Sequence, residues 1–162
     1  MKDAPRIPSK TVRQALAGKG GHIDVRNIFD GLDFRLAGKR PKHAAHSVFQ
    51  LLNHLNFWQD WVVEWLQGNK PKVPEHAAGG WPGSAGPASQ QEWEESVQRF
   101  CTTLNKLCRL ARPSDLLSKQ GKTTRLEMLH NIASHNSYHA GQVVLVRQML
   151  GAWPPPSGGV TW

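Results

Sequence analysis

Two histidines one helical turn apart are the residues of this sequence best suited to chemistry. His135 and His139 lie in the segment 134–142, inside a stretch with the apolar periodicity of a long amphipathic helix. A spacing of four places both imidazoles on one face, with their side-chain bases about 5–6 Å apart, so both rings could turn onto one metal ion. The rest of that face is mostly apolar, and inward-facing imidazoles need polar partners. A shared metal ion would supply one, and hydrogen bonds within a core are the alternative.

A third histidine lies beside the apolar seam of another predicted helix. His54 follows Leu51 by three positions and precedes Trp58 by four, so it could face the interior of the protein. Helical bundles build metal sites from side chains on facing helices. Three nitrogen ligands would leave a coordination position open, which is typical of catalytic rather than structural metal sites. Spacing alone does not bring His54 to the pair, and a hydrogen-bonded core histidine is the alternative here too.

Capping and periodicity signals predict the elements that must position these histidines. We expect four helices, over residues 23–37, 44–67, 89–110 and 124–150. Three of them carry capping boxes, formed by Ser47 with Gln50, Ser89 with Glu92, and Thr124 with Glu127. No segment alternates as a strand does, so the predicted fold class is all-α, a four-helix bundle.

A long loop and two terminal segments complete the expected organisation. Residues 69–89 are rich in Pro, Gly, Ala and Ser and join the second and third helices, which is compatible with a crossover. Loops of that length are usually functional or mobile, so we expect Trp81 to pack back on the body or to cover a site. Residues 1–19 are expected to form an N-terminal extension and residues 20–162 the bundle domain. The Pro-rich tail at 153–159 cannot be helical and is expected to pack over the bundle end.

Composition limits the classes of partner. The chain has 162 residues, enough for one hydrophobic core, and a formal net charge of +8. Its basic residues are scattered and do not alternate with aromatic ones, so we do not expect nucleic acid to be a partner. No apolar run approaches the roughly 20 residues that span a membrane, and the N-terminus does not read as a secretory signal. We therefore expect a cytoplasmic protein.

The two cysteines are expected to be free. Cys101 and Cys108 lie seven apart in a predicted helix, which separates their Cα atoms by about 10 Å. A disulfide needs less than about 7 Å. A thiol ligand or redox role is the alternative to a plain core position.

Three segments resemble the DinB-like (YfiT-type) family of metal-dependent hydrolases. Residues 135–142, His-Asn-Ser-Tyr-His-Ala-Gly-Gln, match its H-x-x-x-H-x-G-Q signature. Residues 47–58 are similar to its first ligand segment, x-L-x-H-x-x-x-W, and Gly-Ala-Trp-Pro-Pro-Pro at 151–156 resembles its tail. The resemblance covers about residues 20–162. It implies a four-helix bundle in which His54, His135 and His139 hold a divalent ion.

The resemblance also implies a class of reaction. The metal is zinc or nickel in the first place, with iron or manganese as further candidates, because neutral imidazoles discriminate weakly among them. Related proteins are hydrolases or thiol S-transferases that use bacillithiol, mycothiol or glutathione, and they are often homodimers. We therefore expect metal-activated water or a low-molecular-weight thiol to attack a small electrophilic substrate.

Several assignments around the histidines stay open, and the catalytic residues are unknown. Gln142 could donate to a water on the metal or make a buried polar contact, and Trp58 could belong to the core or to a substrate wall. Metal-binding imidazoles usually hydrogen-bond through their second nitrogen, for which Asn53 and Tyr138 are candidates. The candidates for a general base are Asp60, Glu64 and Glu127, none of them adjacent to a histidine. The missing base favours a rival hypothesis, a non-enzymatic, stress-associated protein that binds metal or another partner.

Overall fold

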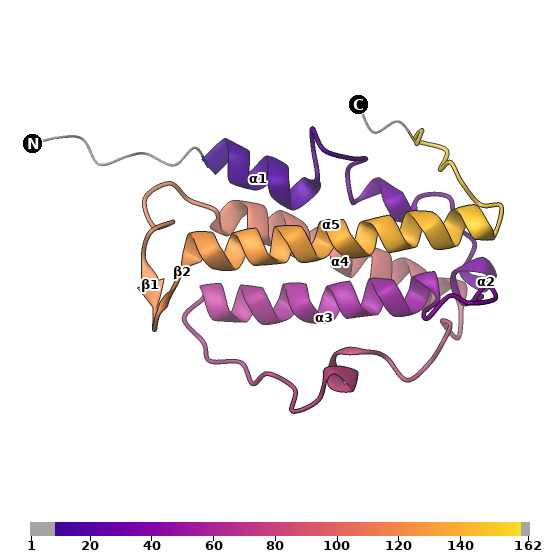
Figure 1. Ribbon diagram of the computed structural model, residues 1–162, viewed down its shortest axis with the longest axis horizontal. Coiled ribbons are helices and arrows are strands. Elements are labelled where there is room, and N and C mark those ends of the chain that lie inside the picture. The colour runs from indigo at the N-terminus through magenta and orange to yellow at the C-terminus, as the bar shows by residue number, and fades with distance from the viewer. Residues whose placement is uncertain (1–8, 160–162) are drawn as a thin grey trace, which may run out of the picture.

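The computed structural model describes residues 9–159, and almost all of its regular structure is helical (Figure 1). Its α-helices are α1 (Ser9–Ala17), α2 (Phe34–Ala37), α3 (Val48–Leu66), α4 (Gln90–Leu110) and α5 (Arg125–Met149). Short 3-10 helices occur at Asn27–Phe29 and Ala77–Gly80, and a small hairpin pairs β1 (Lys119–Gln120) with β2 (Thr123–Thr124). The predicted all-α class is confirmed. Within the described residues, no helix is both long enough and apolar enough to cross a membrane.

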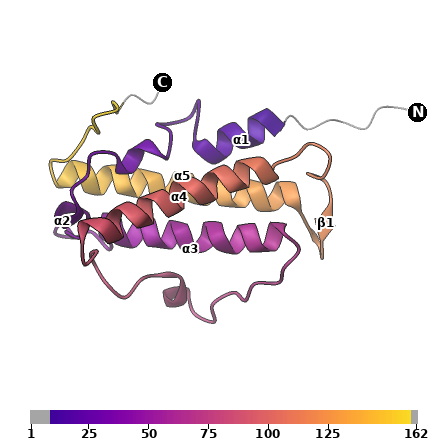
Figure 2. The same ribbon diagram turned by 180° about the vertical axis from the view of Figure 1, so that it is seen from behind.

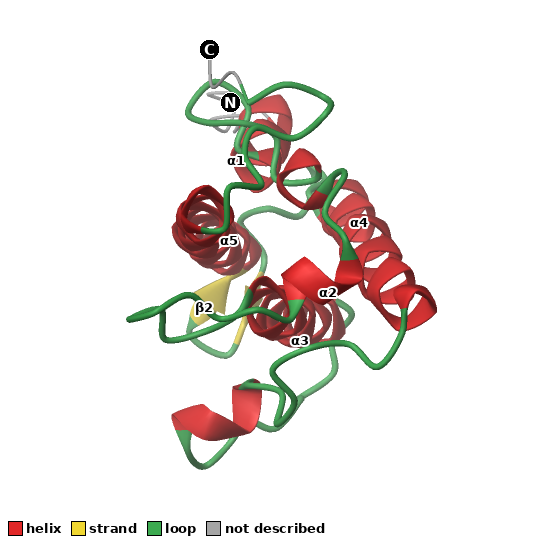
Figure 3. Ribbon diagram, turned by 90° about the vertical axis from the view of Figure 1, so that its right-hand side faces the viewer, coloured by secondary structure: helices red, strands yellow, loops and turns green. Residues whose placement is uncertain are grey.

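Four of these helices form a bundle. Seen end-on, α1 and α3 lie opposite each other, with α4 and α5 on the two sides between them (Figure 3). The closest packing joins α3 to α4 and α5, and α1 to α5. Fully buried apolar side chains from all four helices meet inside: Leu16, Leu52, Leu55, Phe100, Leu104, Leu129 and Val143.

Chain direction explains the long loop. In Figures 1 and 2, α3 and α4 run the same way and α5 runs against both. The chain must therefore return along the length of α3 before α4 can begin. Residues 69–89 make that return, which confirms the expected crossover. The antiparallel pairing of α3 and α5 brings the middle of one helix opposite the middle of the other.

The three long helices begin where their caps predict. The side chains of Ser47, Ser89 and Thr124 each accept a hydrogen bond from the backbone N–H three residues later. Satisfying such an N–H stabilises a helix start. The full capping box forms at Ser47 and at Thr124, whereas Glu92 accepts from the N–H of Ala88 and not from that of Ser89. The second predicted helix begins at its cap and not at residue 44, since Ser47 has an extended backbone with φ −78° and ψ 167°.

The predicted helix over 23–37 is wrong. The chain there forms the 3-10 helix at Asn27–Phe29 and the four-residue α2, separated by Gly31 with a φ of 65°. That left-handed conformation interrupts a right-handed helix. Asp33 then caps α2 by accepting from the backbone N–H of Arg35 at 2.8 Å. Of the five apolar residues that suggested an inward helix face, Leu36 is partly exposed, and four are buried nevertheless: Val25, Ile28, Phe29 and Leu32.

The fourth bundle helix is α1, which the sequence analysis did not predict. It directs Val12 and Leu16 inward and packs mainly against α5. Its length of nine residues is too short for stability in isolation, so contact with the bundle maintains it. The domain boundary expected between residues 19 and 20 stays a prediction.

The tail packs over the bundle end as expected, and Arg147 holds it there. This arginine is only 1% exposed. It donates to the backbone carbonyls of Ile28 at 2.6 Å and Ala152 at 2.9 Å, and its guanidinium lies 5.6 Å from the centre of the Trp153 ring. Farther along the tail, the Ser157 N–H donates to the Asp30 carboxylate at 3.0 Å. Arg147 therefore joins α5, the tail and the segment around Ile28.

Candidate metal centre

The three histidines selected from the sequence lie together between α3 and α5. The ring centres of His54 and His135 are 5.1 Å apart, those of His54 and His139 4.7 Å, and those of the i, i+4 pair 4.5 Å. One ring nitrogen from each lies within 4.8 Å of the other two. His54 and His139 are buried, and His135 is partly exposed. The structure thus places His54 beside the pair, which sequence spacing alone could not predict.

Hydrogen bonds fix the orientation of two of the rings. The Nδ1–H of His54 donates to the backbone carbonyl of Gly80 at 2.7 Å, and the Nδ1–H of His139 donates to the side-chain oxygen of Gln142 at 2.6 Å. An oxygen acceptor at Nδ1 selects the tautomer whose Nε2 carries a free lone pair. Metal-binding histidines characteristically have this second bond. Both rings therefore present Nε2 to the cluster.

The separation of two of the nitrogens, those of His54 and His135, suits a tetrahedral ion. Nε2 of His54 lies 3.2 Å from Nε2 of His135. Two imidazole nitrogens at 2.0–2.1 Å from one tetrahedral zinc ion would be about 3.3 Å apart. Three imidazole nitrogens are a donor set that divalent ions such as zinc accept in proteins. The residues present therefore fit a divalent ion.

Electrostatics keep the rings in the form that binds a cation. Burial, together with the neighbouring His139 and His54, lowers the pKa of His135 to about 4. Burial also lowers the pKa values of His54 and His139, although the bonds to Gly80 and Gln142 partly oppose this. All three rings are therefore neutral near pH 7, and their lone pairs are available to a metal ion.

An indole from the long loop covers the cluster. The Trp81 ring stacks on His54 with centres 3.8 Å apart and planes inclined by 8°. On its other side the same ring stacks on His46, at 3.7 Å and 11°. The expectation that Trp81 packs back on the body is confirmed, and it also shields one face of His54. His46, which lies just before α3, was not among the histidines selected from the sequence, and no local pattern there relates it to Trp81.

Gly80 lets the loop come this close. It is buried, and a Cβ at this position would lie 3.2 Å from Nε1 of Trp58 and 3.6 Å from Nδ1 of His54. Two contacts anchor the loop on either side. The Trp61 indole N–H donates to the Lys72 carbonyl at 3.1 Å, and the Ser47 hydroxyl donates to the carbonyl of Ala85.

Comparison with known families agrees with this geometry. The sequence model of the DinB superfamily matches residues 24–143, which are 120 of the 162 residues and include all three histidines. The chain belongs to the DinB superfamily. Comparisons with curated proteins and with solved structures found no match. The match to the DinB superfamily ends before the tail, so the likeness of residues 151–156 to the family's tail stays a prediction.

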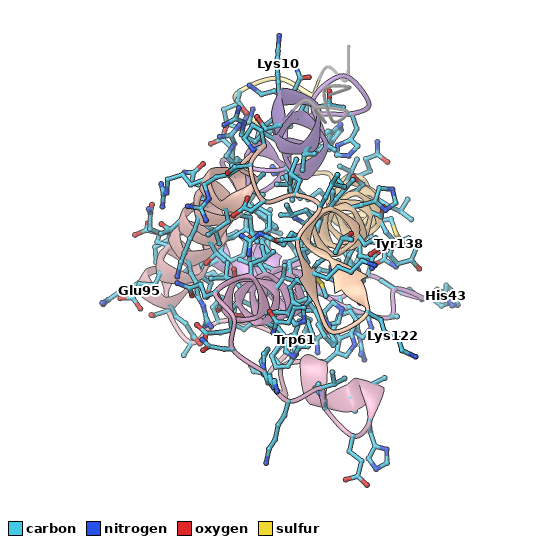
Figure 4. The ribbon with its side chains drawn as sticks, turned by 90° about the vertical axis from the view of Figure 1, so that its left-hand side faces the viewer. Lys10, His43, Trp61, Glu95, Lys122 and Tyr138 are labelled. Carbon is cyan, nitrogen blue, oxygen red and sulfur yellow. The ribbon has the colours of Figure 1, made fainter. Side chains whose placement is uncertain are left out.

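The two residues expected to orient the imidazoles of this DinB-superfamily site do not do so. The Asn53 amide donates to the Phe49 carbonyl in its own helix at 3.1 Å. Tyr138 is 66% exposed and points outward from α5, with only its ring edge near His139 (Figure 4). The partners are instead a backbone carbonyl at Gly80 and the side chain of Gln142. Gln142 is partly exposed and makes a polar contact with His139. Its other possible role, donation to a water on the metal, stays a prediction.

The acidic residues considered as a base all have partners elsewhere. Asp60 accepts from Arg99 at 2.8 Å and from Thr103 at 3.0 Å, both on α4. Glu64 accepts from the side chain of Asn69, and Glu127 caps α5 through Thr124. Across residues 9–159, the histidine cluster contains no carboxylate.

The chain's own thiols are also separate from the cluster. Cys101 and Cys108 are free, as expected, and partly buried on α4. Burial raises the pKa of both thiols, which disfavours the reactive thiolate. A thiol-dependent reaction at this DinB-superfamily site would therefore take its thiol from a separate molecule.

Proposed function

We propose that this protein binds a divalent metal ion through His54, His135 and His139 and promotes attack by a low-molecular-weight thiol on a small electrophile. One observation carries the proposal. Three neutral imidazoles converge, with hydrogen bonds fixing two of them in the ligand tautomer, and within residues 9–159 no carboxylate lies among them. Membership of the DinB superfamily supports the metal site. Zinc or nickel is the expected ion, with iron or manganese as alternatives.

The absence of a carboxylate favours a thiol over water as the nucleophile. A bound divalent ion would supply a positive charge that lowers the pKa of a thiol or a water molecule next to it. A thiol has a pKa near 8.5 and needs little help, whereas hydrolytic metal sites usually add a carboxylate base. The acidic candidates here bond to other residues.

Each group of the chain has a definite task in such a transfer. Gly80 and Gln142 hold two of the imidazoles in position, and Trp81 excludes water from one face of His54. The thiol sulfur forms a bond to the electrophilic carbon, the leaving group departs with its electron pair, and the thiol proton passes to solvent. Neutral rings offer no charge to repel the incoming cation.

The test begins with metal content. Protein purified without a His tag should contain about one divalent ion per chain in the wild type and almost none after His54→Ala. His130→Ala is the matched control, because His130 is exposed on α5 and outside the cluster. Absence of bound metal from the wild type after growth with added zinc and nickel would overturn the site.

Activity separates the two reactions. Glutathione or bacillithiol with 1-chloro-2,4-dinitrobenzene should be consumed in a reaction that chelator and His54→Ala abolish. Hydrolysis of p-nitrophenyl acetate without any thiol, lost on the same treatments, would instead identify a hydrolase.

The engaged carboxylates also favour a second candidate, a non-enzymatic metal-binding protein. Such a protein would contain stoichiometric metal yet convert neither an electrophile with thiol nor an ester. His135→Ala would then change metal content alone. Homodimer formation and a cytoplasmic location stay predictions.

A further inference from the structure

An apolar pocket opens between α3 and α5 directly beside His135. It has a volume of about 320 Å³, at the small end of the range for ligand pockets. Its walls come from two facing helices, with Trp58 and Trp61 on α3, and Met128, Asn131, Ile132 and His135 on α5.

The walls select against charge. Apart from His135, the lining side chains have no ionisable group, and most of them are aromatic or aliphatic. The Trp61 indole N–H already bonds to the Lys72 carbonyl, so its ring offers carbon atoms to the pocket. Figure 4 shows Trp61 pointing from α3 toward the long loop. An ion entering this space would lose water and gain no oppositely charged partner.

The pocket and the histidine cluster share His135. His135 belongs to both, as a proposed metal ligand on one side and a pocket wall on the other. Trp58 also joins them, because its ring lies 6.4 Å from the rings of both His54 and His135. A molecule with its apolar part between the two helices would therefore have its other end at the cluster.

We propose that this pocket binds the apolar part of the substrate, an uncharged aromatic or branched aliphatic group, and so places the electrophilic carbon beside His135. The identity of the reacting end rests on the proposed function. Binding of the apolar part does not, because the tryptophan, methionine and isoleucine walls hold it without a metal ion.

A neutral dye and pocket-filling variants test this. N-Phenyl-1-naphthylamine, whose fluorescence rises in apolar surroundings, should bind the wild type. Met128→Trp should weaken binding by about tenfold or more, because the larger ring occupies the pocket. Met149→Trp is the matched control, since Met149 is 49% exposed near the other end of the same helix, and it should change the affinity by less than about twofold.

Asn131→Trp is a second pocket variant, which keeps the test valid if Met128→Trp does not fold. Asn131 is exposed at the pocket rim, so its replacement should leave the core intact while blocking entry. Unchanged dye affinity in both pocket variants would overturn the proposal. An equal loss in the Met149→Trp control would do the same, because binding would then be unspecific.

Metal content keeps the two proposals apart. His139→Ala removes a proposed metal ligand that does not line the pocket, so this variant should lose the metal ion and retain the dye. The wild type could be found to contain no metal and yet to bind the dye, with binding blocked by Asn131→Trp. That result would support the pocket and contradict the proposed function. Metal bound without any specific dye binding would support the metal site and contradict the pocket.

Discussion

One hydrogen bond from each of two rings sets the orientation of the histidine cluster. His54 and His139 each donate from Nδ1 to an oxygen, whereas Nδ1 of His135 is buried without a hydrogen-bond partner within residues 9–159. Two of the three candidate ligands are therefore held in orientation without any ion. The third ring has more freedom to adjust to it.

Replacing Gln142 should weaken metal binding without abolishing it. Gln142→Ala removes the acceptor that orients His139, and loss of such a partner typically reduces metal affinity about 10- to 100-fold. Gln142→Glu keeps an oxygen acceptor and should retain most of the affinity. Competition with a chromophoric chelator measures both. Gln148→Ala, at an exposed position of α5, is the control, and an affinity of Gln142→Ala equal to that of the control would contradict this role.

The metal-free protein should lose stability as the pH falls from about 6.5 toward 4. The pKa of His135 is about 4 in the folded protein, against about 6.5 in an unfolded chain. Between these values the unfolded chain binds the extra proton, so protonation favours unfolding, by at most about 3 kcal/mol from this residue. His135→Gln should flatten the decrease. Urea unfolding in chelator at several pH values measures it, and equal slopes for variant and wild type would refute the assignment.

The residues of the site differ in how far the sequence could predict them. The spacing of His135 and His139 depends only on helix geometry, so it predicted their shared face. His54 required the family resemblance, because no local rule relates positions 54 and 135. The roles of Gly80, Trp81 and His46 depend on the path of a long loop, and that path is set by tertiary contacts.

Among the elements, the loop over residues 69–89 covers one side of the histidine cluster. Its contacts with the bundle occur at both ends and in the middle, and Gly86 meets Gly38 so closely that a Cβ on either residue would lie 2.9 Å from the other's Cα. The loop therefore belongs to the folded body although it is almost without regular structure.

A side chain at Gly80 should disturb both the fold and the site. Gly80→Val would press on Trp58 and on the ring of His54, and such overpacking costs about 1–3 kcal/mol. Metal affinity should fall as well, because the carbonyl that orients His54 must move. Gly83→Val is the matched control, since a Cβ there meets nothing within 4 Å. Thermal unfolding and chelator competition measure the two effects, and equal behaviour of the two variants would contradict the prediction.

The helices show where sequence rules succeed and fail. Capping boxes and apolar periodicity located α3, α4 and α5 because those signals are local. In the segment 23–37 the periodicity correctly indicated burial, but the left-handed Gly31 prevents a continuous helix. The short α1 depends on α5 for support, and local sequence does not reveal such a partner.

Across the whole molecule, Arg147 connects segments that are far apart in sequence. Arg147→Met should destabilise the protein, because the carbonyls of Ile28 and Ala152 lose their donor, and each buried group left unpaired costs about 1–3 kcal/mol. Arg109→Met, at an exposed position of α4, is the control. Urea unfolding measures the change. Metal content should stay the same, and a variant as stable as the control would contradict this role.

The bond between His54 and His135 joins positions 81 residues apart. An ion bound by both histidines would link α3 to α5 and so close a loop of the chain between positions 54 and 135. Such a link would act as a cross-link that a chelator can remove. Closing so long a loop restricts the unfolded chain far more than it restricts the folded one. With the ion in place, partial unfolding would release α1 and the tail first and leave α3 and α5 tied together. Without the ion this cross-link would be missing, and packing alone would hold α3 and α5 together.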